Sequence, residues 1–401
     1  MIPLGPLPKA PLGVAVSGGG DSVALLLLLH ENGHDLRAAT VDHRLRPEAA
    51  AEALGVGELC AKLGVPHEIL CWESPEFTGN LQKAAREARQ GLLAAWARRQ
   101  GLKHILLGHT LDDQAETVLM RLARGSGVDG LAGMAAKRCA AGLCWHRPLL
   151  AARRAGLRDF LRARGVGWVD DPSNDDLKYD RVKARQALAI LAPLGIEAQG
   201  LARTAAHMRR ARGALEAATY GLAKRAVTIS KAGELGLSGF ETAPREVQLR
   251  LLAAALGWVS GAGYRPRFSA LEGLLESCNN GGNFGKTLHG CAITRRAGGI
   301  VINRELAATP SPAPVGKTWD GRWEINLKDT KAMQIRALGK DGLHSCMHWR
   351  DSGHSRAALL ASPSFWREGA LYAAPLANFG PFSGVKLLGD AKGFYDALIT
   401  H

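Results

Sequence analysis

The sequence predicts an α/β fold built on a mostly parallel sheet, and three observations lead to this prediction. A short apolar segment, Leu12 to Val16, runs into a glycine-rich turn and then into a second apolar run, Val23 to Leu29. Similar short apolar segments alternate with longer amphipathic ones up to about residue 150, as strands alternate with helices. Beyond that point the alternation stops, and a Pro-rich stretch follows at 309–314. We therefore expect a parallel-sheet α/β domain, then a mainly helical region, then a small C-terminal domain of mixed type.

Each expected element follows from local apolar periodicity and from turn residues. Strands are expected over 12–16, 36–41, 67–72 and 104–107, and helices over 21–29, 47–63, 81–99 and 112–124. Two more helices, over 152–164 and 180–191, flank a polar loop at 170–176, and helical periodicity then continues to about Leu256. Residues 287–303 alternate as a β-hairpin does. The expected domains are 1–200 (α/β), 201–308 (basic, mainly helical, ending in the hairpin), 309–316 (linker) and 317–401 (small, mixed).

Composition and charge limit the classes of protein to consider. Of the 401 residues, 46% are hydrophobic and 22% are charged, which is typical of a globular protein. We expect a cytoplasmic protein without a membrane span or signal peptide, because the longest apolar run is far shorter than the roughly 20 residues that cross a bilayer. Seven cysteines without a C-x-x-C pair predict reduced thiols. The net charge of +14 favours a polyanionic partner such as nucleic acid.

The loop Ser17-Gly18-Gly19-Gly20-Asp21-Ser22 follows the first expected strand, at the edge where parallel sheets bind ligands. Glycines let backbone N–H groups approach phosphate oxygens, and the N-terminus of the next helix adds positive partial charge. Asp21 would repel phosphate unless a Mg²⁺ ion bridges the two. The loop therefore predicts a nucleotide site with Mg²⁺ at Asp21. The alternative is a tight turn in which Asp21 or Ser22 caps the helix.

A second group of chemically competent residues is His109, Asp113 and Glu116, spaced i, i+4 and i+7. This spacing predicts that they share one helix face. Two carboxylates and an imidazole can hold cationic groups, and one of them can accept a proton from an amine. The alternative is a capped helix in which Asp112 and Asp113 complement the helix dipole and Glu116 is exposed. Helix capping explains one carboxylate well, but it explains three acidic residues together with a histidine poorly. We therefore favour a binding site.

The glycine loop resembles that of the PP-loop ATP pyrophosphatases, which split ATP between the α- and β-phosphates, and further segments are similar to the tRNA(Ile)-lysidine synthetases among them. These segments recur in order: Thr40–His43 with Leu45-Arg46, Asn80–Gln82 with Ala85–Arg89, Leu107–Thr117, Gly130–Met134, Arg147–Leu150 and Asp171–Asn174. The resemblance is strong over about 12–185 and weak beyond. It implies a Rossmann-like PP-loop domain at the N-terminus.

The resemblance also implies an activity: ATP and Mg²⁺ adenylate the wobble cytidine of tRNA(Ile) with a CAU anticodon, and free L-lysine is joined to carbon 2 of that base. The amine nucleophile comes from the substrate, so the protein supplies positioning and electrostatics. Ser17 to Ser22, with Asp42 and His43, then bind ATP. Asp113 and Glu116 bind lysine, His109 assists them, and Arg89 contacts ATP phosphates or the adenylate. For Arg89, and for Arg86 on the same helix face, a solvated position is the alternative.

Two residues depart from the family pattern without touching a carboxylate, namely Gln90 after Arg89 and Val182 after Arg181. Three rival functions stay open. A sulfur-inserting PP-loop tRNA enzyme would use paired cysteines, whereas Cys139 and Cys144 are expected to be buried apolar residues. An ammonia-dependent amide synthetase would not need a basic middle region, and a non-catalytic RNA-binding protein would not need the intact loop. The oligomeric state is not determined by the sequence, and a homodimer is compatible with it.

The excess of positive charge lies in the middle of the sequence. Residues 1–150 hold 16 basic and 15 acidic side chains, residues 151–350 hold 31 and 18, and the last 51 hold four of each. The middle segment includes a cluster at Arg203, Arg209, Arg210 and Arg212. We expect this cluster to bind the polyanionic tRNA. The alternative is a solvated helix face.

Overall fold

The computed structural model describes residues 2–45, 48–73, 81–170, 178–280, 282–296, 298–326, 332–381 and 384–399. The chain forms two compact units, Met1–Arg212 and Gly213–Thr400. The domain boundaries expected from the sequence stay predictions. Arg46, Asn80 and the loop Asp171–Asn174, which carry part of the sequence resemblance, lie outside the described residues.

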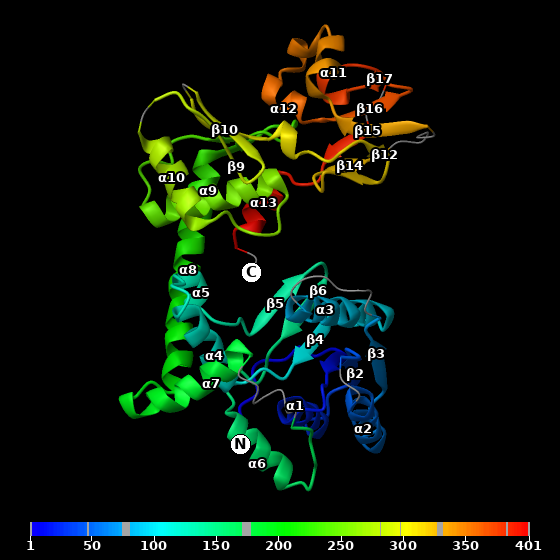
Figure 1. The fold of residues 1–401 in the computed structure, drawn as a ribbon, viewed down its shortest axis with the longest axis vertical. Coiled ribbons are helices and arrows are strands. Elements are labelled where there is room, and N and C mark those ends of the chain that lie inside the picture. The colour runs from blue at the N-terminus through cyan, green and yellow to red at the C-terminus, as the bar shows by residue number, and fades with distance from the viewer. Residues whose placement is uncertain are drawn as a thin grey trace. The chain divides into compact units, whose positions relative to one another are not determined.

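The first unit contains a six-stranded sheet in the order β3-β2-β1-β4-β6-β5, in which only β5 runs antiparallel to its neighbour (Figure 1). Its strands are β1 (Leu12–Ala15), β2 (Leu36–Asp42), β3 (His67–Cys71), β4 (His104–Leu107), β5 (Lys137–Ala140) and β6 (Leu143–His146). Its helices are α1 (Gly20–Glu31), α2 (Glu48–Lys62), α3 (Leu81–Arg99), α4 (Leu111–Leu122), α5 (Val128–Leu131), α6 (Arg154–Arg162), α7 (Asp180–Leu191) with η2 (Ala192–Leu194), and the first half of α8 (Ala198–Ala226). The predicted parallel-sheet α/β fold is confirmed.

Helices cover both faces of this sheet, as parallel strands require. One core contains the apolar run of α1 together with Val56 of α2 and Leu157 of α6. The other core, on α3, contains Leu93 and Trp96. Because β1 is buried between these layers, its carboxyl end and the following loop are held rigidly at one edge of the sheet.

The second unit combines helices with three antiparallel sheets. Its middle part holds the end of α8, α9 (Arg245–Ser260), α10 (Phe268–Asn279) and a sheet of β7 (Val227–Ile229), β8 (Leu235–Leu237), β9 (Gly285–Leu288), β10 (Cys291–Arg296) and β11 (Gly299–Arg304), followed by η3 (Leu306–Ala308). The C-terminal part holds β12 (Ala313–Pro314), β13 (Thr318–Trp319), β14 (Trp323–Ile325), β15 (Met333–Ala337), β16 (Pro363–Arg367), β17 (Ala370–Ala373) and β18 (Val385–Leu387). Its helices are α11 (Gly339–Ser345), η4 (Trp349–Ser352), α12 (Arg356–Leu360), η5 (Pro375–Ala377) and α13 (Ala391–Ala397).

The predicted helical region and the hairpin of β10 and β11 are confirmed, but helix was wrongly predicted over 227–237. There the chain forms β7 and β8, which extend the hairpin into a five-stranded sheet. The alternation of Val227, Ile229, Leu235 and Leu237 is too short to stand out beside the long helix before it. The described helices include none that is long and apolar enough to cross a membrane.

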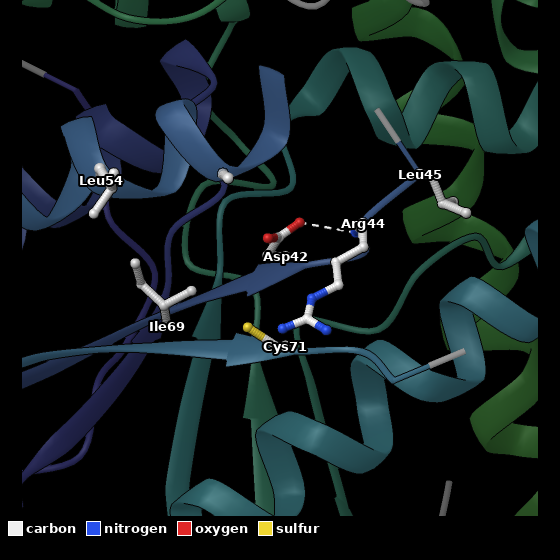
Figure 2. Close-up of a pocket in the computed structure, with 7 residues that line it drawn as sticks. Asp42, Arg44, Leu45, Leu54, Ile69 and Cys71 are labelled. Atoms are coloured by element: carbon white, nitrogen blue, oxygen red, sulfur yellow. Dashed lines mark hydrogen bonds between the residues drawn. The ribbon is translucent and has the colours of Figure 1, made fainter. Parts of the chain in front are cut away.

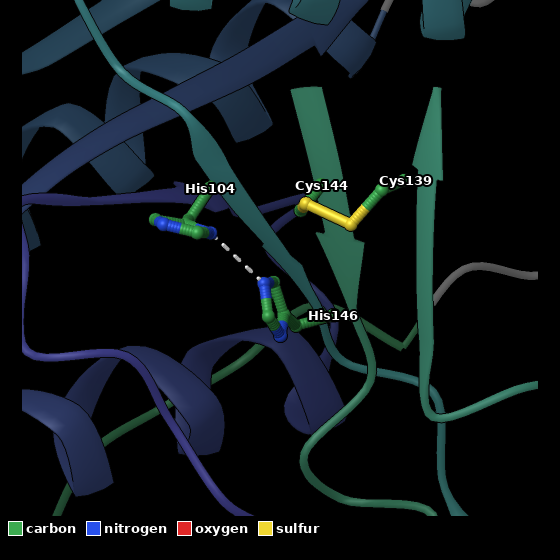
Figure 3. Close-up of a disulfide and its surroundings, with 4 residues drawn as sticks. All are labelled: His104, Cys139, Cys144 and His146. Carbon is green, nitrogen blue, oxygen red and sulfur yellow. Dashed lines mark hydrogen bonds between the residues drawn. A yellow bond between two sulfur atoms is a disulfide. The ribbon is translucent and has the colours of Figure 1, made fainter. Parts of the chain in front are cut away.

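The prediction of reduced, buried cysteines was wrong for one pair. Cys139 and Cys144 are cross-strand partners in the antiparallel pair β5–β6, with Cα atoms 4.0 Å apart, and they form a disulfide (Figure 3). Cys139 is exposed. Four residues separate the two cysteines in sequence, but the turn after Ala140 places them opposite each other. His104 and His146 lie nearby, with Nδ1 and Nε2 3.1 Å apart.

Candidate functional site: a phosphate loop beside a carboxylate cluster

The glycine loop joins β1 to α1 as predicted. Gly18 has a φ of +85°, a conformation that side chains other than glycine rarely adopt. Ser22 closes the loop internally, because its Oγ accepts a hydrogen bond from Ser17 N at 3.1 Å and donates one to Gly19 O at 2.8 Å. No described side chain caps α1 at its N-cap residue Gly19. The helix N-terminus is therefore available to an anion, and the alternative of a side-chain-capped turn is wrong.

The end of β4 approaches this loop closely. A Cβ atom added to Gly108 would lie 3.0 Å from Ser22 N, so only glycine allows this contact. Residues that follow β4 are thereby placed beside the N-terminus of α1. Trp168 and Val169 pack on the other side of the loop, with Val169 N donating to Gly18 O at 3.0 Å.

The carboxylate cluster lies on α4, directly after this approach. Thr110 is the N-cap and forms a capping box with Asp113, whose Oδ2 accepts hydrogen bonds from Thr110 N at 2.8 Å and Thr110 Oγ1 at 2.9 Å. His109 precedes the helix, so the prediction that it shares a face of α4 was wrong. Glu116 is only 1% exposed, which contradicts the alternative of an exposed residue. Asp113 therefore caps the helix and also faces the site.

Arg154, the first residue of α6, connects the carboxylates to the glycine loop. Its Nε lies 2.9 Å from Asp21 Oδ2 and its Nη2 lies 2.9 Å from Asp113 Oδ1. Its Nη1 lies 3.3 Å from Glu116 Oε1, which also accepts a hydrogen bond from Arg185 Nε at 3.0 Å. Glu116 Oε2 is buried without a partner among the described residues. The cluster is therefore a built cation site in which one acceptor oxygen is unused.

The sequence reasoning missed Arg154 and Arg185. Asp21 and Arg154 are separated by 133 positions, and no spacing rule relates them. In the sequence, the Arg153-Arg154 pair at the start of a helix is only weak evidence for a site residue, because most arginines in such positions are exposed to solvent.

The electrostatics of the site follow from this packing. Burial opposes ionisation of Asp113, but the Arg154 guanidinium and the Thr110 N–H outweigh it and lower the pKa of that carboxyl below its usual range. Burial raises the pKa of Asp21, only partly offset by Arg154. Burial and the neighbouring arginines lower the pKa of His109 to about 3, so its imidazole is neutral at physiological pH.

Asp42 is the last residue of β2, and His43 follows it at the same sheet edge. Asp42 is buried and its Oδ1 accepts a hydrogen bond from Arg44 N at 2.8 Å. His43 Nδ1 is buried and unpartnered among the described residues. A pocket of about 720 Å³ adjoins Asp42 and is lined by β2, β3 and α2 (Figure 2). Its apolar lining, which includes Leu45, Leu54 and Ile69, suits a flat ring system.

Arg89 lies on α3 close enough to His43 and His109 to lower the pKa of both, after burial, which is the larger cause. Arg89 forms no ion pair with a described carboxylate, whereas Arg86 is an exposed neighbour. The structure thus places Arg89 close to both His43 and His109.

The Gly130–Met134 segment is tightly held from α4 and α8. Gln114 pairs with the backbone N and O of Met134 at 2.7 and 3.0 Å. Arg121 donates to Gly130 O at 2.7 Å, and Arg209 donates to Ala132 O at 2.9 Å. Arg209, expected to bind tRNA, is therefore half-buried and engaged by this segment.

The other three residues of the predicted arginine cluster differ in exposure. Arg203 and Arg210 are exposed and lie seven positions apart, on one face of α8, whereas Arg212 is half-buried. The four side chains therefore do not form a single surface.

The carboxylate of Asp21, beside the glycine loop, could hold Mg²⁺ only together with nucleotide phosphates. The described residues contain no group of three His, Cys, Asp or Glu side chains arranged to hold a metal ion. Mg²⁺ is commonly bound through one or two carboxylates together with substrate phosphates, and Asp21 offers such a carboxylate beside the loop. The residues present therefore fit a nucleotide-bound metal and do not fit a protein-only metal site.

The comparisons with known proteins agree with this geometry. Residues 3–191 match the family model of a PP-loop domain. The chain is 47% identical over 401 residues to a tRNA(Ile)-lysidine synthase of Ruegeria pomeroyi, covering 98% of this chain and 95% of the relative. It is 40% identical over 325 residues to the protein of that name from Hyphomonas neptunium, covering 77% and 86%.

Likeness to solved structures is small: the U34-tRNA thiolase NcsA of Methanococcus maripaludis has 17% identity and a TM-score of 0.44, covering 50% of this chain and 73% of that one. The extent of the match to the curated relatives decides the family. The chain belongs to the tRNA(Ile)-lysidine synthase family.

Proposed function

We propose that this chain ligates free L-lysine to carbon 2 of the wobble cytidine of tRNA(Ile) with a CAU anticodon, at the expense of ATP. The observation that carries the proposal is the cation site on α4, where Asp113 and Glu116 already hold a guanidinium beside the phosphate loop. A ligase for lysine needs this adjacency, because the amine must reach a base that ATP has just activated.

The phosphate loop supports the first half-reaction. The oxygen on carbon 2 of cytosine attacks the α-phosphate of ATP, the bond to the β-phosphate breaks, and diphosphate leaves. Backbone N–H groups of Gly18 to Gly20 and the N-terminus of α1 stabilise the phosphate charge. The pocket beside Asp42 accepts the adenine ring, and Arg89 faces the phosphates or the adenylate. A Mg²⁺ ion held by Asp21 would neutralise phosphate charge.

The carboxylate cluster supports the second half-reaction. The side-chain amine of lysine attacks carbon 2, the bond to the adenylated oxygen breaks, and AMP leaves; one of the two carboxylates or the neutral imidazole of His109 accepts the proton that the amine gives up. Asp113 and the unpartnered Oε2 of Glu116 bind the cationic groups of lysine, in competition with Arg154. Neutral His109 adds no positive charge beside the ammonium group. Adenylation turns a poor leaving group into AMP, so the protein needs no nucleophile of its own.

The remaining assignments belong to the same proposal. The PP-loop domain over 1–200 is catalytic, and the regions 201–308 and 317–401 contact tRNA. Residues 309–316 were expected to be a linker, but Ala313 and Pro314 form β12 and pair with β15. The protein acts in the cytoplasm. A homodimer remains a prediction that analytical ultracentrifugation can check. The sulfur-inserting alternative gains no support from the named relatives, which are lysidine synthases.

The deciding experiment mixes the protein with Mg-ATP, labelled lysine and a tRNA(Ile) transcript that carries a CAU anticodon. Label is expected in the tRNA, with one AMP released per lysine joined. A transcript with a different base at the wobble position is the matched control and should take up no label. Well-folded protein that leaves the CAU transcript unlabelled would overturn the proposal.

A further inference from the structure

Three arginines lie around His109 and Arg89. Arg147 and Arg181 are close to His109, and Arg86 is close to Arg89 and Arg147. Arg86 lies on α3, Arg147 follows β6, and Arg181 lies on α7; none of them forms an ion pair with a described carboxylate. We call these three residues the arginine basin. Arg154 lies in the same unit and contacts three carboxylates, so the basin differs in kind from the cation site on α4.

Direct contacts show that one member of the basin, Arg147, is fixed in place and partly desolvated. Arg147 Nη1 donates to Ala135 O at 2.8 Å, while its Nε is buried with no acceptor among the described residues. His109 Nδ1 is also buried without a partner there. Arg147 and Arg181 both lie close enough to His109 to disfavour its protonation. Arg147 and the neighbouring His109 thus each hold one buried polar atom without a partner among the described residues.

Like charges held together at a partly buried site cost free energy unless an anion binds them. Burial, followed by the neighbouring Arg86, lowers the pKa of Arg147, and the pKa of Arg89 is lowered by the same two causes with Arg181 as a third. No described acid offsets these effects. An anionic ligand would supply the missing acceptors and the missing charge.

The positive charge continues from the basin toward α8. Arg121 of α4 is close to both Arg86 and Arg212, which lower its pKa after burial, the largest cause. Arg121 and Arg209 both donate to carbonyl oxygens of the Gly130–Met134 segment. Guanidinium groups therefore extend within the first unit from His109 to the helix that carries the exposed Arg203.

We propose that the arginine basin binds a backbone phosphate of the RNA substrate next to the nucleotide that reacts. The inference rests on the proposed function, which already places the phosphates of ATP at the Ser17–Ser22 loop and Arg89. A series of guanidinium groups that leads away from that loop suits a polynucleotide, whose phosphates repeat, better than one nucleotide. The net charge over residues 1–150 is only +1 and gives no sign of this site. The reason is that acidic side chains, including those of the cluster on α4, balance the basic ones in number, while the described ones form no ion pair with the basin.

The test compares Arg86→Glu with Arg98→Glu, a matched change on an exposed arginine near the other end of α3. Affinity for the tRNA(Ile) transcript is measured over a range of salt concentrations, and ATP affinity is measured without RNA. R86E is expected to weaken RNA binding about tenfold and to reduce the salt slope by about one, with ATP affinity unchanged. R98E should change neither affinity. Arg147→Lys keeps the charge but loses the fork that reaches Ala135 O, and should weaken RNA binding less than R86E.

Two results would overturn the proposal. If R86E binds RNA as tightly as R98E, the basin does not contact RNA. If R86E loses affinity for ATP and RNA alike, the anion is a phosphate of ATP. Lysine ligation by the unchanged protein is recorded in parallel. If the unchanged protein ligates lysine but R86E binds RNA normally, only the proposal for the arginine basin is rejected. If the unchanged protein binds RNA but does not ligate lysine, only the proposed function is rejected.

Discussion

Replacing Arg154 by methionine tests whether the carboxylate cluster depends on this guanidinium. Methionine keeps an unbranched apolar stem and removes the group that contacts Asp21, Asp113 and Glu116. The cluster would then hold three carboxylates with Arg185 as the cation that still contacts Glu116. We expect the first unit to be less stable at neutral pH.

The magnitude follows from burial. Removing one partner of a fully buried ion pair costs about 3–5 kcal/mol. The Arg154 side chain is 20% exposed and Glu116 retains Arg185, so the expected loss is smaller. We expect about 2 kcal/mol, or a fall in Tm of about 4–8 °C for a unit of this size. Arg158→Met is the matched control one turn along α6, since its pair with Asp170 is 40% and 64% exposed. That change should cost less than about 0.5 kcal/mol.

The pH dependence gives a second signature. Arg154 holds the pKa of Asp113 below its usual range in the folded protein. That interaction adds stability above the pKa of the unfolded chain, about 3.9, and the stability is lost as pH falls through the lower folded pKa. In Arg154→Met the carboxylates favour protonation instead, so the variant regains stability relative to the unchanged protein as pH falls from about 7.5 to about 5.

Thermal unfolding of the full-length protein and both variants at the two pH values measures these effects. The reasoning is refuted if Arg154→Met loses no more stability than Arg158→Met. It is also refuted if the deficit of Arg154→Met is as large at about pH 5 as at about pH 7.5, because the loss would then not arise from ionised carboxylates.

Three further predictions concern substrate binding. Asp113→Asn and Glu116→Gln should each raise the KM for lysine roughly tenfold or more and leave the KM for ATP nearly unchanged, because a charge-assisted hydrogen bond is lost; equal effects on both constants in steady-state assays would contradict the lysine site. Reversing the charge of Arg203 and Arg210 together should weaken tRNA binding about tenfold and reduce its salt dependence, without effect on ATP binding. The matched Arg209→Ala change should instead lower Tm, since that side chain holds a backbone segment, and unchanged tRNA affinity in the double variant would show a solvated face. Replacing both cysteines of the disulfide by alanine should leave lysine ligation intact, and a loss of activity would favour the sulfur-inserting alternative.

Much of the fold could be predicted because it depends on local pattern. The runs around Val14, Ala38 and Ile105 are apolar on both sides, as expected for strands of a covered parallel sheet, and the structure buries them. Strands β7 and β8 were missed because each has only three residues and gains its stability from pairing with β11 and with each other. Cys139 and Cys144 were misassigned because the short hairpin of β5 and β6, which pairs them, was not predicted.

The candidate site also contains residues that the sequence reveals and residues whose position depends on the fold. Ser17 to Ser22 and the pair Asp113 and Glu116 are recognisable in sequence, because a phosphate loop needs consecutive glycines and a helix face needs a fixed spacing. The placement of His109 before α4 depended on which residue caps the helix, and Thr110 took that position.

The sequence by itself determined the parallel-sheet domain, the phosphate loop and the acidic residues of α4, because these depend on neighbouring residues and on helical or strand periodicity. The tertiary structure alone decided what those acids contact. Arg154 reaches Asp21 across 133 positions, and Arg209 reaches Ala132 across 77, because packing of α6 and α8 brings them there. Charge pairing over such separations leaves no periodic trace in a single sequence, so the burial of each charge and the partner that it contacts became visible only in the folded chain.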